Sequence, residues 1–317
     1  INFLSKRRFA YIGSFTFITI GLTLVYIQGG LNLGVDFTGG RSYVVAFNNP
    51  VVTSKLKVAL TDDFQKAGTE VKWYGSSHVV KVTTSYLVND ESTEADETVE
   101  KALIAGIAET TGLSYILDDS KVDDQHFSIS GSSKVGATIA DDIKTSSLES
   151  VLFALIAIFL YILMRFKKWQ FSLGAIIALF HDVLFVISAF AIARLFGKAF
   201  ELDQVFIAAM LTIIGYSIND TVVVFDRIRE NLAVRPHEKA IDTFNLSINT
   251  TMNRTVITSL TTLIVVLILL LFGGEVLRSF SFALFVGIIV GTYSSIFIAT
   301  PAVLDLGKSK YASKGDS

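Results

Sequence analysis

The segment Val205–Phe225, VFIAAMLTIIGYSINDTVVVF, decides the fold because it is apolar enough to cross a membrane and yet contains Asp220. A membrane-spanning helix needs about 20 mostly apolar residues. A charge inside the hydrocarbon costs about 2.5–3.5 kcal/mol on insertion scales, so such residues usually face a protein-lined interior or an ion path. The segment therefore predicts a membrane protein that handles protons or ions.

Five further segments have the length and apolarity of a membrane span: Phe9–Ile27, Leu148–Met164, Phe171–Ala193, Thr255–Phe272 and Phe280–Leu304. The chain has 317 residues, is 51% hydrophobic, and has a mean hydropathy of +0.55. This composition is too apolar for an ordinary soluble protein. We predict a multi-pass α-helical membrane protein with six transmembrane helices.

Basic residues gather at one end of each predicted span: Lys6, Arg7, Arg8, Arg165, Lys167, Lys168, Arg227, Arg229, Arg235, Lys239, Lys308, Lys310 and Lys314. With six spans, all these residues fall on one side of the membrane. Cytoplasmic loops carry the excess of Lys and Arg. The pattern predicts that both termini are cytoplasmic and that the chain lies in the inner (cytoplasmic) membrane.

The predicted domain division follows from this topology. It comprises a cytoplasmic N-terminus with the first span (1–31), an extracytoplasmic domain (32–147), spans two to six (148–305) and a cytoplasmic tail (306–317). The extracytoplasmic domain contains about 17 carboxylates against about 10 Lys or Arg, which suits a solvated domain.

Residue patterns in the extracytoplasmic domain predict an α+β fold. The predicted strands and helices are Arg41–Phe47, Thr53–Ala67, Val71–Tyr74, His78–Tyr86 and Glu97–Thr111, with a last strand at Leu113–Leu117 or His126–Ser130. The order βαββαβ is that of a ferredoxin-like domain. Residues 88–96 are expected to form an acidic loop, and the acidic run 118–124 a solvated loop, because it lacks EF-hand spacing.

Three ionisable residues lie within or beside the predicted spans: Asp182, Asp220 and Arg254. The fourth and fifth spans run antiparallel, so Asp220 and Arg254 are expected at similar depth, where they could form an ion pair or a gated contact. A carboxylate that alternates between an arginine and a water-free environment would take up and release a proton. The alternatives left open are a static pair that fixes helix packing and, for Arg254, a side chain that reaches the interface.

Asp182, the deepest of the three, is expected to act either as a relay or as a protonated carboxyl that hydrogen-bonds a neighbouring helix. His181 beside it is interpreted as a packing or hydrogen-bonding residue rather than a metal ligand, since no second histidine is near. Gly287 and Gly291 form a small-xxx-small pair, and Gly215 is expected to allow a similar close helix approach.

No residue pattern indicates enzyme chemistry or a cofactor. The chain has no cysteine, no phosphate-binding loop, no nucleophile–base set and no metal-ligand spacing. Its basic residues follow membrane topology, so nucleic-acid binding is not indicated. Because residue 1 is Ile1 rather than Met, we expect a trimmed chain or part of a longer polypeptide.

Five motifs resemble the SecF family of the bacterial SecDF protein-export complex, within the RND superfamily: LGVDFTGG (33–40), HD (181–182), GYSINDTVVVFDRIREN (215–231), NRT (253–255) and LFGG (271–274). Their order and spacing cover most of the chain. The second half carries most of the resemblance.

The resemblance implies a subunit that pairs with a SecD-like subunit, works beside the SecYEG channel and uses the proton motive force to draw unfolded preproteins outward. It implies proton-transport roles for Asp220, Arg254 and Asp182. Ser217, Asn219 and Arg227 are expected to support them. Asp36, Gly39 and Gly40 are expected to form a hinge or base contact, or simply a tight turn before the first strand.

Three other functions remain open from the sequence. The first is an RND-type proton-driven exporter of small molecules or lipids. The second is an intramembrane aspartyl protease using Asp182 and Asp220, although its usual Gly-x-Gly-Asp is replaced by SIND at 217–220. The third is a structural scaffold for the channel, in which neutralising Asp220 would impair assembly but not energy coupling.

Overall fold

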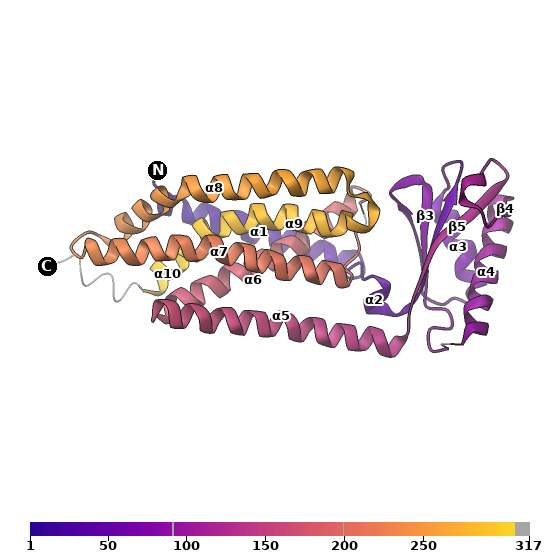
Figure 1. Ribbon diagram of the computed structural model, residues 1–317, viewed down its shortest axis with the longest axis horizontal. Helices are drawn as coiled ribbons and strands as arrows, with labels where there is room; N and C mark the ends of the chain where they lie inside the picture. Colours follow the sequence, from indigo (N-terminus) through magenta and orange to yellow (C-terminus); the bar gives the residue numbers. More distant parts are fainter. Residues whose placement is uncertain (91, 199, 308–317) are drawn as a thin grey trace. The chain divides into compact units, whose positions relative to one another are not determined.

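The computed structural model describes residues 1–90, 92–198 and 200–307 (Figure 1). It divides into two compact units: unit 1 comprises Ile1–Asn32 and Glu149–Ser317, and unit 2 comprises Leu33–Leu148. The basic tail residues Lys308, Lys310 and Lys314, which entered the topology prediction, lie outside the described residues.

The described residues contain six helical segments long and apolar enough to cross a membrane, as the sequence predicts: Leu4–Ile27, Ala137–Phe166, Trp169–Leu195, Gln204–Val234, Ala240–Phe272 and Leu277–Leu306. The elements that build them are η1 (Leu4–Lys6), α1 (Arg7–Ile27), α5 (Ala137–Phe166), α6 (Trp169–Leu195), α7 (Gln204–Val234), α8 (Ala240–Phe272), α9 (Gly274–Ser294), the π-helical turn η3 (Ser295–Ala299) and α10 (Thr300–Leu306). The protein is mostly helical, with one small sheet.

Helices α7 and α8 extend well beyond the predicted spans. Helix α7 continues past Phe225 and α8 begins before Thr255, because helical packing continues where the apolar run ends. The added turns bury Phe244 and Ile248 in one hydrophobic cluster, and Asn231 Nδ2 donates a 2.8 Å hydrogen bond to Ser247 Oγ. At about 1.5 Å per residue, α7 is about 46 Å long, against about 30 Å for the hydrocarbon core. The α7–α8 hairpin therefore reaches past the hydrocarbon.

Small residues bring α9 close to α7. A Cβ atom on Gly287 would collide with the Ile213 side chain, and one on Gly291 would lie 2.9 Å from Ser217 Cβ. The predicted small-xxx-small contact is therefore present. For Gly215 the prediction is wrong within this chain: a Cβ there would meet no described atom within 4 Å, because Gly215 is on an exposed face of α7.

Unit 2 contains a five-stranded sheet in the order β2-β3-β1-β5-β4. Its strands are β1 (Gly40–Phe47), β2 (Thr69–Tyr74), β3 (Ser76–Thr84), β4 (Ser114–Tyr115) and β5 (His126–Val135). The pairs β2–β3, β3–β1 and β1–β5 are antiparallel, whereas β4 pairs with β5 in parallel. Both segments considered for the last strand are therefore strands.

The remaining elements of unit 2 are α2 (Val35–Thr38), α3 (Thr53–Asp63), α4 (Thr93–Thr111) and η2 (Asp119–Lys121). Helix α4 begins four residues earlier than expected, at Thr93 rather than Glu97. The reason is an N-cap: Ser92 Oγ accepts a 3.2 Å hydrogen bond from the Ala95 amide. The expected acidic loop 88–96 is thus partly helical.

The core of unit 2 joins the sheet to α3 and α4. Apolar strand residues such as Val45 and Val80 contact Leu56 from α3 and Leu103 from α4 in one buried cluster. At the edge of this core Arg41 is only 2% exposed.

Candidate functional site

Asp182 on α6 is buried in the interior of unit 1, with its side chain 1% exposed. Its Oδ2 atom accepts hydrogen bonds from Ser217 Oγ of α7 at 2.7 Å and from Ser294 Oγ of α9 at 2.8 Å. Its Oδ1 atom lies 3.0 Å from His181 Nδ1. Both oxygens therefore have partners, and the carboxylate links three helices.

Asp220 on α7 is also buried, with 4% exposure, but its hydrogen bonds are long. Oδ2 accepts from Ser259 Oγ of α8 at 3.3 Å and from Thr292 Oγ1 of α9 at 3.5 Å. The two hydroxyls lie only 2.6 Å from each other. Since hydrogen bonds weaken with distance, Asp220 is held more loosely than Asp182.

A second pair of hydroxyls lies between α7 and the π-helical turn η3 that follows α9. Thr221 Oγ1 and Ser295 Oγ are 2.8 Å apart, and Ser295 Oγ also donates to the Gly291 carbonyl at 2.9 Å. Together with the two aspartates, these hydroxyls form one group, which we call the polar core: Asp182, Ser217, Asp220, Thr221, Ser259, Thr292, Ser294 and Ser295. It is surrounded by apolar helix faces.

Local sequence explains how these side chains meet. Residues three or four apart share a helix face, so Ser217 points the same way on α7 as Asp220 and Thr221. Gly291 admits Ser217 at close range on the facing helix. Just after Ser294 the helix widens into the π-helical turn η3, where Thr300 Oγ1 donates to the Ser295 carbonyl at 2.8 Å. Such turns are frequent at functional sites.

Arg254 does not close an ion pair with Asp220. It is exposed on α8, and within residues 1–90, 92–198 and 200–307 it makes no salt bridge. It is nevertheless near enough to Asp220 for a charge–charge interaction. The structure is thus compatible with Asp220 and Arg254 at a similar depth along their helices. The ion pair between them is not formed.

The structure separates two supporting candidates from the polar core. Asn219 is exposed on α7. Arg227 donates to Glu230 at 2.7 Å and to Thr250 Oγ1 at 3.3 Å, towards the end of the α7–α8 hairpin. Only Ser217 among the three supporting candidates contacts a predicted proton-site residue.

The motif at Asp36, Gly39 and Gly40 belongs to unit 2. Gly39 has φ +68° and Gly40 has φ +116°, a region that favours glycine. A Cβ atom on Gly40 would collide with the Thr84 carbonyl oxygen on the neighbouring strand. Both glycines are therefore required by the backbone path that leads into β1.

Sequence reasoning missed the hydroxyls that surround the aspartates. Ser259, Thr292, Ser294 and Ser295 all lie in predicted spans. All five residues that follow Val290, GTYSS, are small or hydroxyl-bearing, and this run could have indicated them. The sequence does not show toward which neighbouring helix each hydroxyl group points, because this direction depends on helix packing and on the π-helical turn.

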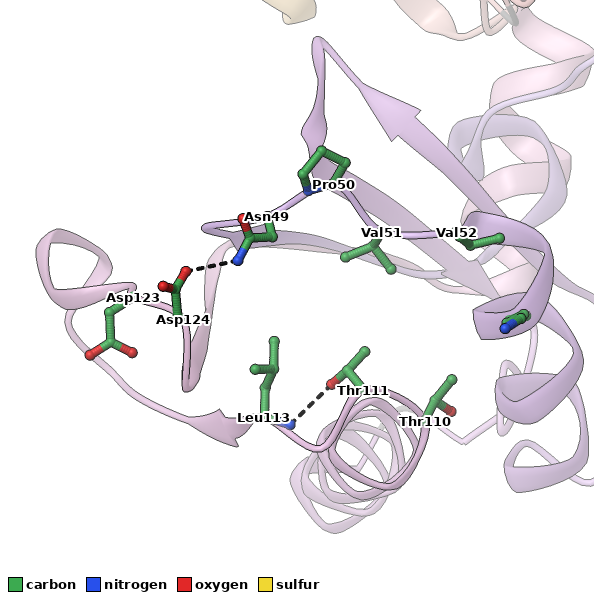
Figure 2. Close-up of a pocket in the computed structure, with 10 residues that line it drawn as sticks. Asn49, Pro50, Val51, Val52, Thr110, Thr111, Leu113, Asp123 and Asp124 are labelled. Carbon is green, nitrogen blue, oxygen red and sulfur yellow. Dashed lines mark hydrogen bonds between the residues drawn. The ribbon is translucent and has the colours of Figure 1, made fainter.

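A shallow cleft of about 340 Å³ in unit 2 is the other polar concavity of note (Figure 2). Its acidic side chains are already engaged: Asp124 Oδ1 accepts from Asn49 Nδ2 at 2.7 Å, and Asp123 Oδ1 lies 2.7 Å from His126 Nδ1. No group of three or more potential metal ligands occurs among the described residues. We assign no role to this cleft.

The polar core can hold and transfer protons. Carboxylates accept protons, and a hydroxyl both donates and accepts, so it can serve a carboxylate or a neutral carboxylic acid. Burial makes a permanent charge costly, which favours a carboxyl group that exchanges its proton. The loose hydrogen bonds of Asp220, with Arg254 nearby and in no salt bridge with a described residue, would permit such an exchange.

Comparison with known proteins agrees with this architecture. Residues 117–309 match the family model described as protein export membrane protein SecD/SecF, C-terminal, and residues 28–51 match the SecD/SecF GG motif. The chain is 42% identical to the protein translocase subunit SecF of Rhodothermus marinus, over 96% of this chain and 92% of the relative. It is 38% identical to that of Thermodesulfovibrio yellowstonii, over 98% and 95%.

Solved structures show the same likeness. A SecDF crystal structure from Thermus thermophilus, described as a translocon-associated membrane protein, aligns with a TM-score of 0.78 at 32% identity. The alignment covers 97% of this chain but only 39% of the SecDF chain. A second SecDF structure, in a super-membrane-facing form, aligns with a TM-score of 0.65 over 99% of this chain and 40% of the other. The chain belongs to the SecF family of protein translocase subunits.

Proposed function

We propose that this chain pairs with a SecD-like subunit and couples proton movement across the membrane to the export of unfolded preproteins through the SecYEG channel. Support comes from the curated relatives, which are named protein translocase subunit SecF. The SecDF chain it resembles is more than twice as long. A partner that supplies the remaining helices is therefore part of the proposal.

The proposed placement is the inner membrane, with both termini cytoplasmic and residues 32–147 outside. The division into 1–31, 32–147, 148–305 and 306–317 follows from it. Basic residues at alternate helix ends support this orientation. For the outer domain we propose a ferredoxin-like fold, supported by the strand order β2-β3-β1-β5 with antiparallel pairing throughout and by one helix after β1 and another after β3.

The observation that carries the proposal is the polar core. Asp182 is firmly held by two short hydrogen bonds, whereas Asp220 is loosely held beside an arginine that makes no salt bridge with it. In the proposed cycle Asp220 alternates between the hydroxyls of Ser259 and Thr292 and the guanidinium of Arg254. The first partners suit the protonated form, and the arginine suits the ionised form.

The energy of one proton crossing the membrane is enough to drive a two-state conformational change. Moving one charge through 100 mV is worth about 2.3 kcal/mol, and RT is about 0.59 kcal/mol, so one proton biases a two-state change by about 50-fold. In this proposal Asp36, Gly39 and Gly40 form the hinge between the first helix and the outer domain. Ser217 supports Asp182 directly, and Asn219 and Arg227 act on the cytoplasmic half of α7.

The decisive experiment reconstitutes the chain with its SecD-like partner and the channel in sealed vesicles. Asp220→Asn is compared with the parent for preprotein export and proton flux under an imposed gradient, and assembly is checked in the same sample. Asp242→Asn, an exposed carboxylate in the first turn of α8, is the matched control. We expect Asp220→Asn to assemble and to lose gradient-stimulated export and flux.

If Asp220→Asn keeps both, the intramembrane carboxylate is structural and the coupling proposal fails. If assembly itself is lost while a surviving fraction stays coupled, the scaffold function is supported instead. An aspartyl protease is disfavoured because Asp182 and Asp220, both described residues, are held by different hydroxyls and share no hydrogen bond.

A second candidate function, RND-type export of small molecules or lipids, has one observation in its favour. A cleft of about 550 Å³ in unit 1 is lined almost wholly by apolar side chains of α1, α6 and α9, among them Phe9, Phe17, Phe185 and Ile289. The test is gradient-driven efflux of an apolar dye from vesicles that hold the chain and its partner but no channel. Efflux that Asp220→Asn abolishes would favour this function over protein export.

A further inference from the structure

His181 stands out as a buried titratable side chain that the proposed cycle does not use. Its side chain is 9% exposed, and Nδ1 lies 3.0 Å from Asp182 Oδ1. Its Nε2 atom is buried and has no hydrogen-bond partner among the described residues. Leaving a buried polar atom unpaired costs about 1–3 kcal/mol, so its retention points to a use.

The contact with Asp182 determines the chemistry of the imidazole. An ionised carboxylate only accepts hydrogen bonds, so the ring atom that faces it must donate. While Asp182 is ionised, the neutral imidazole therefore carries its hydrogen on Nδ1, and Nε2 presents a free lone pair. This is the arrangement in which a carboxylate orients a histidine so that its far nitrogen can accept a proton.

We infer that His181 is the proton-relay residue that loads Asp182. A proton delivered by water binds Nε2, the hydrogen on Nδ1 passes to Asp182 Oδ1, and an O–H bond forms as the Nδ1–H bond breaks. One proton enters the pair, and both residues end neutral. The inference rests on the proposed proton coupling and extends it by one residue.

The surroundings of the imidazole suit this role. The ring packs against Phe185, at 5.8 Å between centroids, and against Tyr293, at 6.1 Å. The Tyr293 hydroxyl is engaged elsewhere, because it donates to the Ala10 carbonyl at 3.0 Å and lies 3.0 Å from Ser14 Oγ. Tyr293 and Phe185 also line the cleft of about 550 Å³ in unit 1. That cleft is the proposed side from which a proton reaches Nε2.

The groups that could compete for this proton lie on the elements packed against α6. Their described titratable side chains are Arg8, Tyr11 and Tyr26 of α1, Tyr216, Asp220, Asp226, Arg227, Arg229 and Glu230 of α7, Arg278 and Tyr293 of α9, and Asp305 of α10, which pairs with Arg7 of α1 at 3.4 Å. Ser217 and Ser294, which reach Asp182 from α7 and α9, are hydroxyls. Among the described residues, Asp182 is the carboxylate that hydrogen-bonds the imidazole.

The test uses His181→Gln in the complex reconstituted with the SecD-like partner. The glutamine amide can donate to Asp182 but cannot take up one proton and release another. The matched control is His126→Gln, since His126 also contacts an aspartate, with Nδ1 2.7 Å from Asp123 Oδ1, but outside the membrane-spanning helices. We expect His181→Gln to lower proton flux at least about tenfold and to weaken the dependence of that flux on pH.

Three outcomes separate the possibilities, with Asp220→Asn measured alongside. Loss of flux and of the pH dependence in His181→Gln, with normal assembly, supports the relay. Unchanged flux in His181→Gln, when Asp220→Asn abolishes it, overturns the relay and leaves the proposed function standing. Unchanged flux in both variants overturns the proposed function, and the relay with it.

A second measurement covers the case in which His181→Gln does not assemble. The chain has 4 histidines, and the other three, His78, His126 and His237, lie outside the membrane-spanning helices. Replacing those three by Gln leaves His181 as the single ¹⁵N-histidine signal in the assembled complex. We expect the neutral ring to carry its hydrogen on Nδ1 while Asp182 is ionised, and on Nε2 once lowering the pH has loaded Asp182. A ring whose hydrogen stays on the same nitrogen throughout the pH series would contradict the relay.

Discussion

Ser217 Oγ donates a 2.7 Å hydrogen bond to Asp182 Oδ2 while its Cβ packs against Gly291, so one small side chain ties α7 to both α6 and α9. The close approach at Gly291 is what brings Ser294 to the same carboxylate oxygen at 2.8 Å. Helix packing and the hydrogen bonding of the polar core are therefore coupled. A change at either glycine of the 287–291 pair alters the site without touching a charge.

Gly291→Ala is expected to destabilise the isolated chain. The new Cβ would lie 2.9 Å from Ser217 Cβ, and overpacking of this kind costs about 1–3 kcal/mol. Gly215→Ala is the matched control, because a Cβ there meets nothing within 4 Å and alanine favours a helix by about 0.5–1 kcal/mol. Thermal unfolding in detergent should show shifts of opposite sign. Equal shifts would mean that Gly291 is not a close-packed position.

Gly40→Ala is expected to destabilise unit 2 by more than about 1 kcal/mol, because φ +116° and the Thr84 carbonyl both exclude a side chain. Gly131→Ala on β5, with open space around it, should stay within about 0.5 kcal/mol of the parent. Urea unfolding of the full chain can be followed by Trp73 fluorescence after Trp169→Phe, since the chain has 2 tryptophans. A tolerated Gly40→Ala would show that the loop adopts another backbone path.

Asp96 should make unit 2 sensitive to acid. The hydrogen bond from Lys134 Nζ, together with the Arg41 guanidinium 2.6 Å away, lowers the pKa of Asp96 below its ordinary value. A depressed pKa in the folded state adds stability above the unfolded value of about 3.9, and this stability is lost as pH falls through the folded value.

The measurement is thermal unfolding of the full chain between pH 6 and pH 2. Asp96→Asn should lower stability at pH 6 and reduce the loss on acidification, whereas Asp62→Asn, an exposed carboxylate on α3, should behave like the parent. The same acid dependence in Asp96→Asn and the parent would assign the effect to other carboxylates.

Arg254→Gln should separate stability from function. Its side chain is exposed and makes no salt bridge with a described residue, so the free energy of unfolding should change by less than about 0.5 kcal/mol. Gradient-dependent export in the reconstituted complex should nevertheless fall at least about tenfold, because ionised Asp220 would lose its alternative partner. Arg194→Gln, in the last turn of α6, is the control. Export unaffected by Arg254→Gln would remove the arginine from the proposed cycle.

Apolarity and motif order in the sequence were enough to determine the class of this protein. Six runs of about 20 apolar residues can satisfy their backbone groups in lipid only as helices. Period-two and helical patterns likewise predicted most elements of unit 2. The full extent of α7 and α8 was not predicted, because the apolar runs end at Phe225 and begin at Thr255 while both helices continue beyond them.

The tertiary structure alone decided which groups surround the two aspartates. Asp182 and Asp220 were recognisable in the sequence as costly charges, but Ser259, Thr292 and Ser294 reach them from positions 39 or more residues away along the chain. Hydroxyl residues are common in membrane helices, and only close packing at Gly287 and Gly291 and the π-helical turn η3 select the ones that meet a carboxylate. The same packing leaves Arg254 outside the contact that its spacing suggested, because a side chain's partner depends on helix rotation, which residue spacing does not specify.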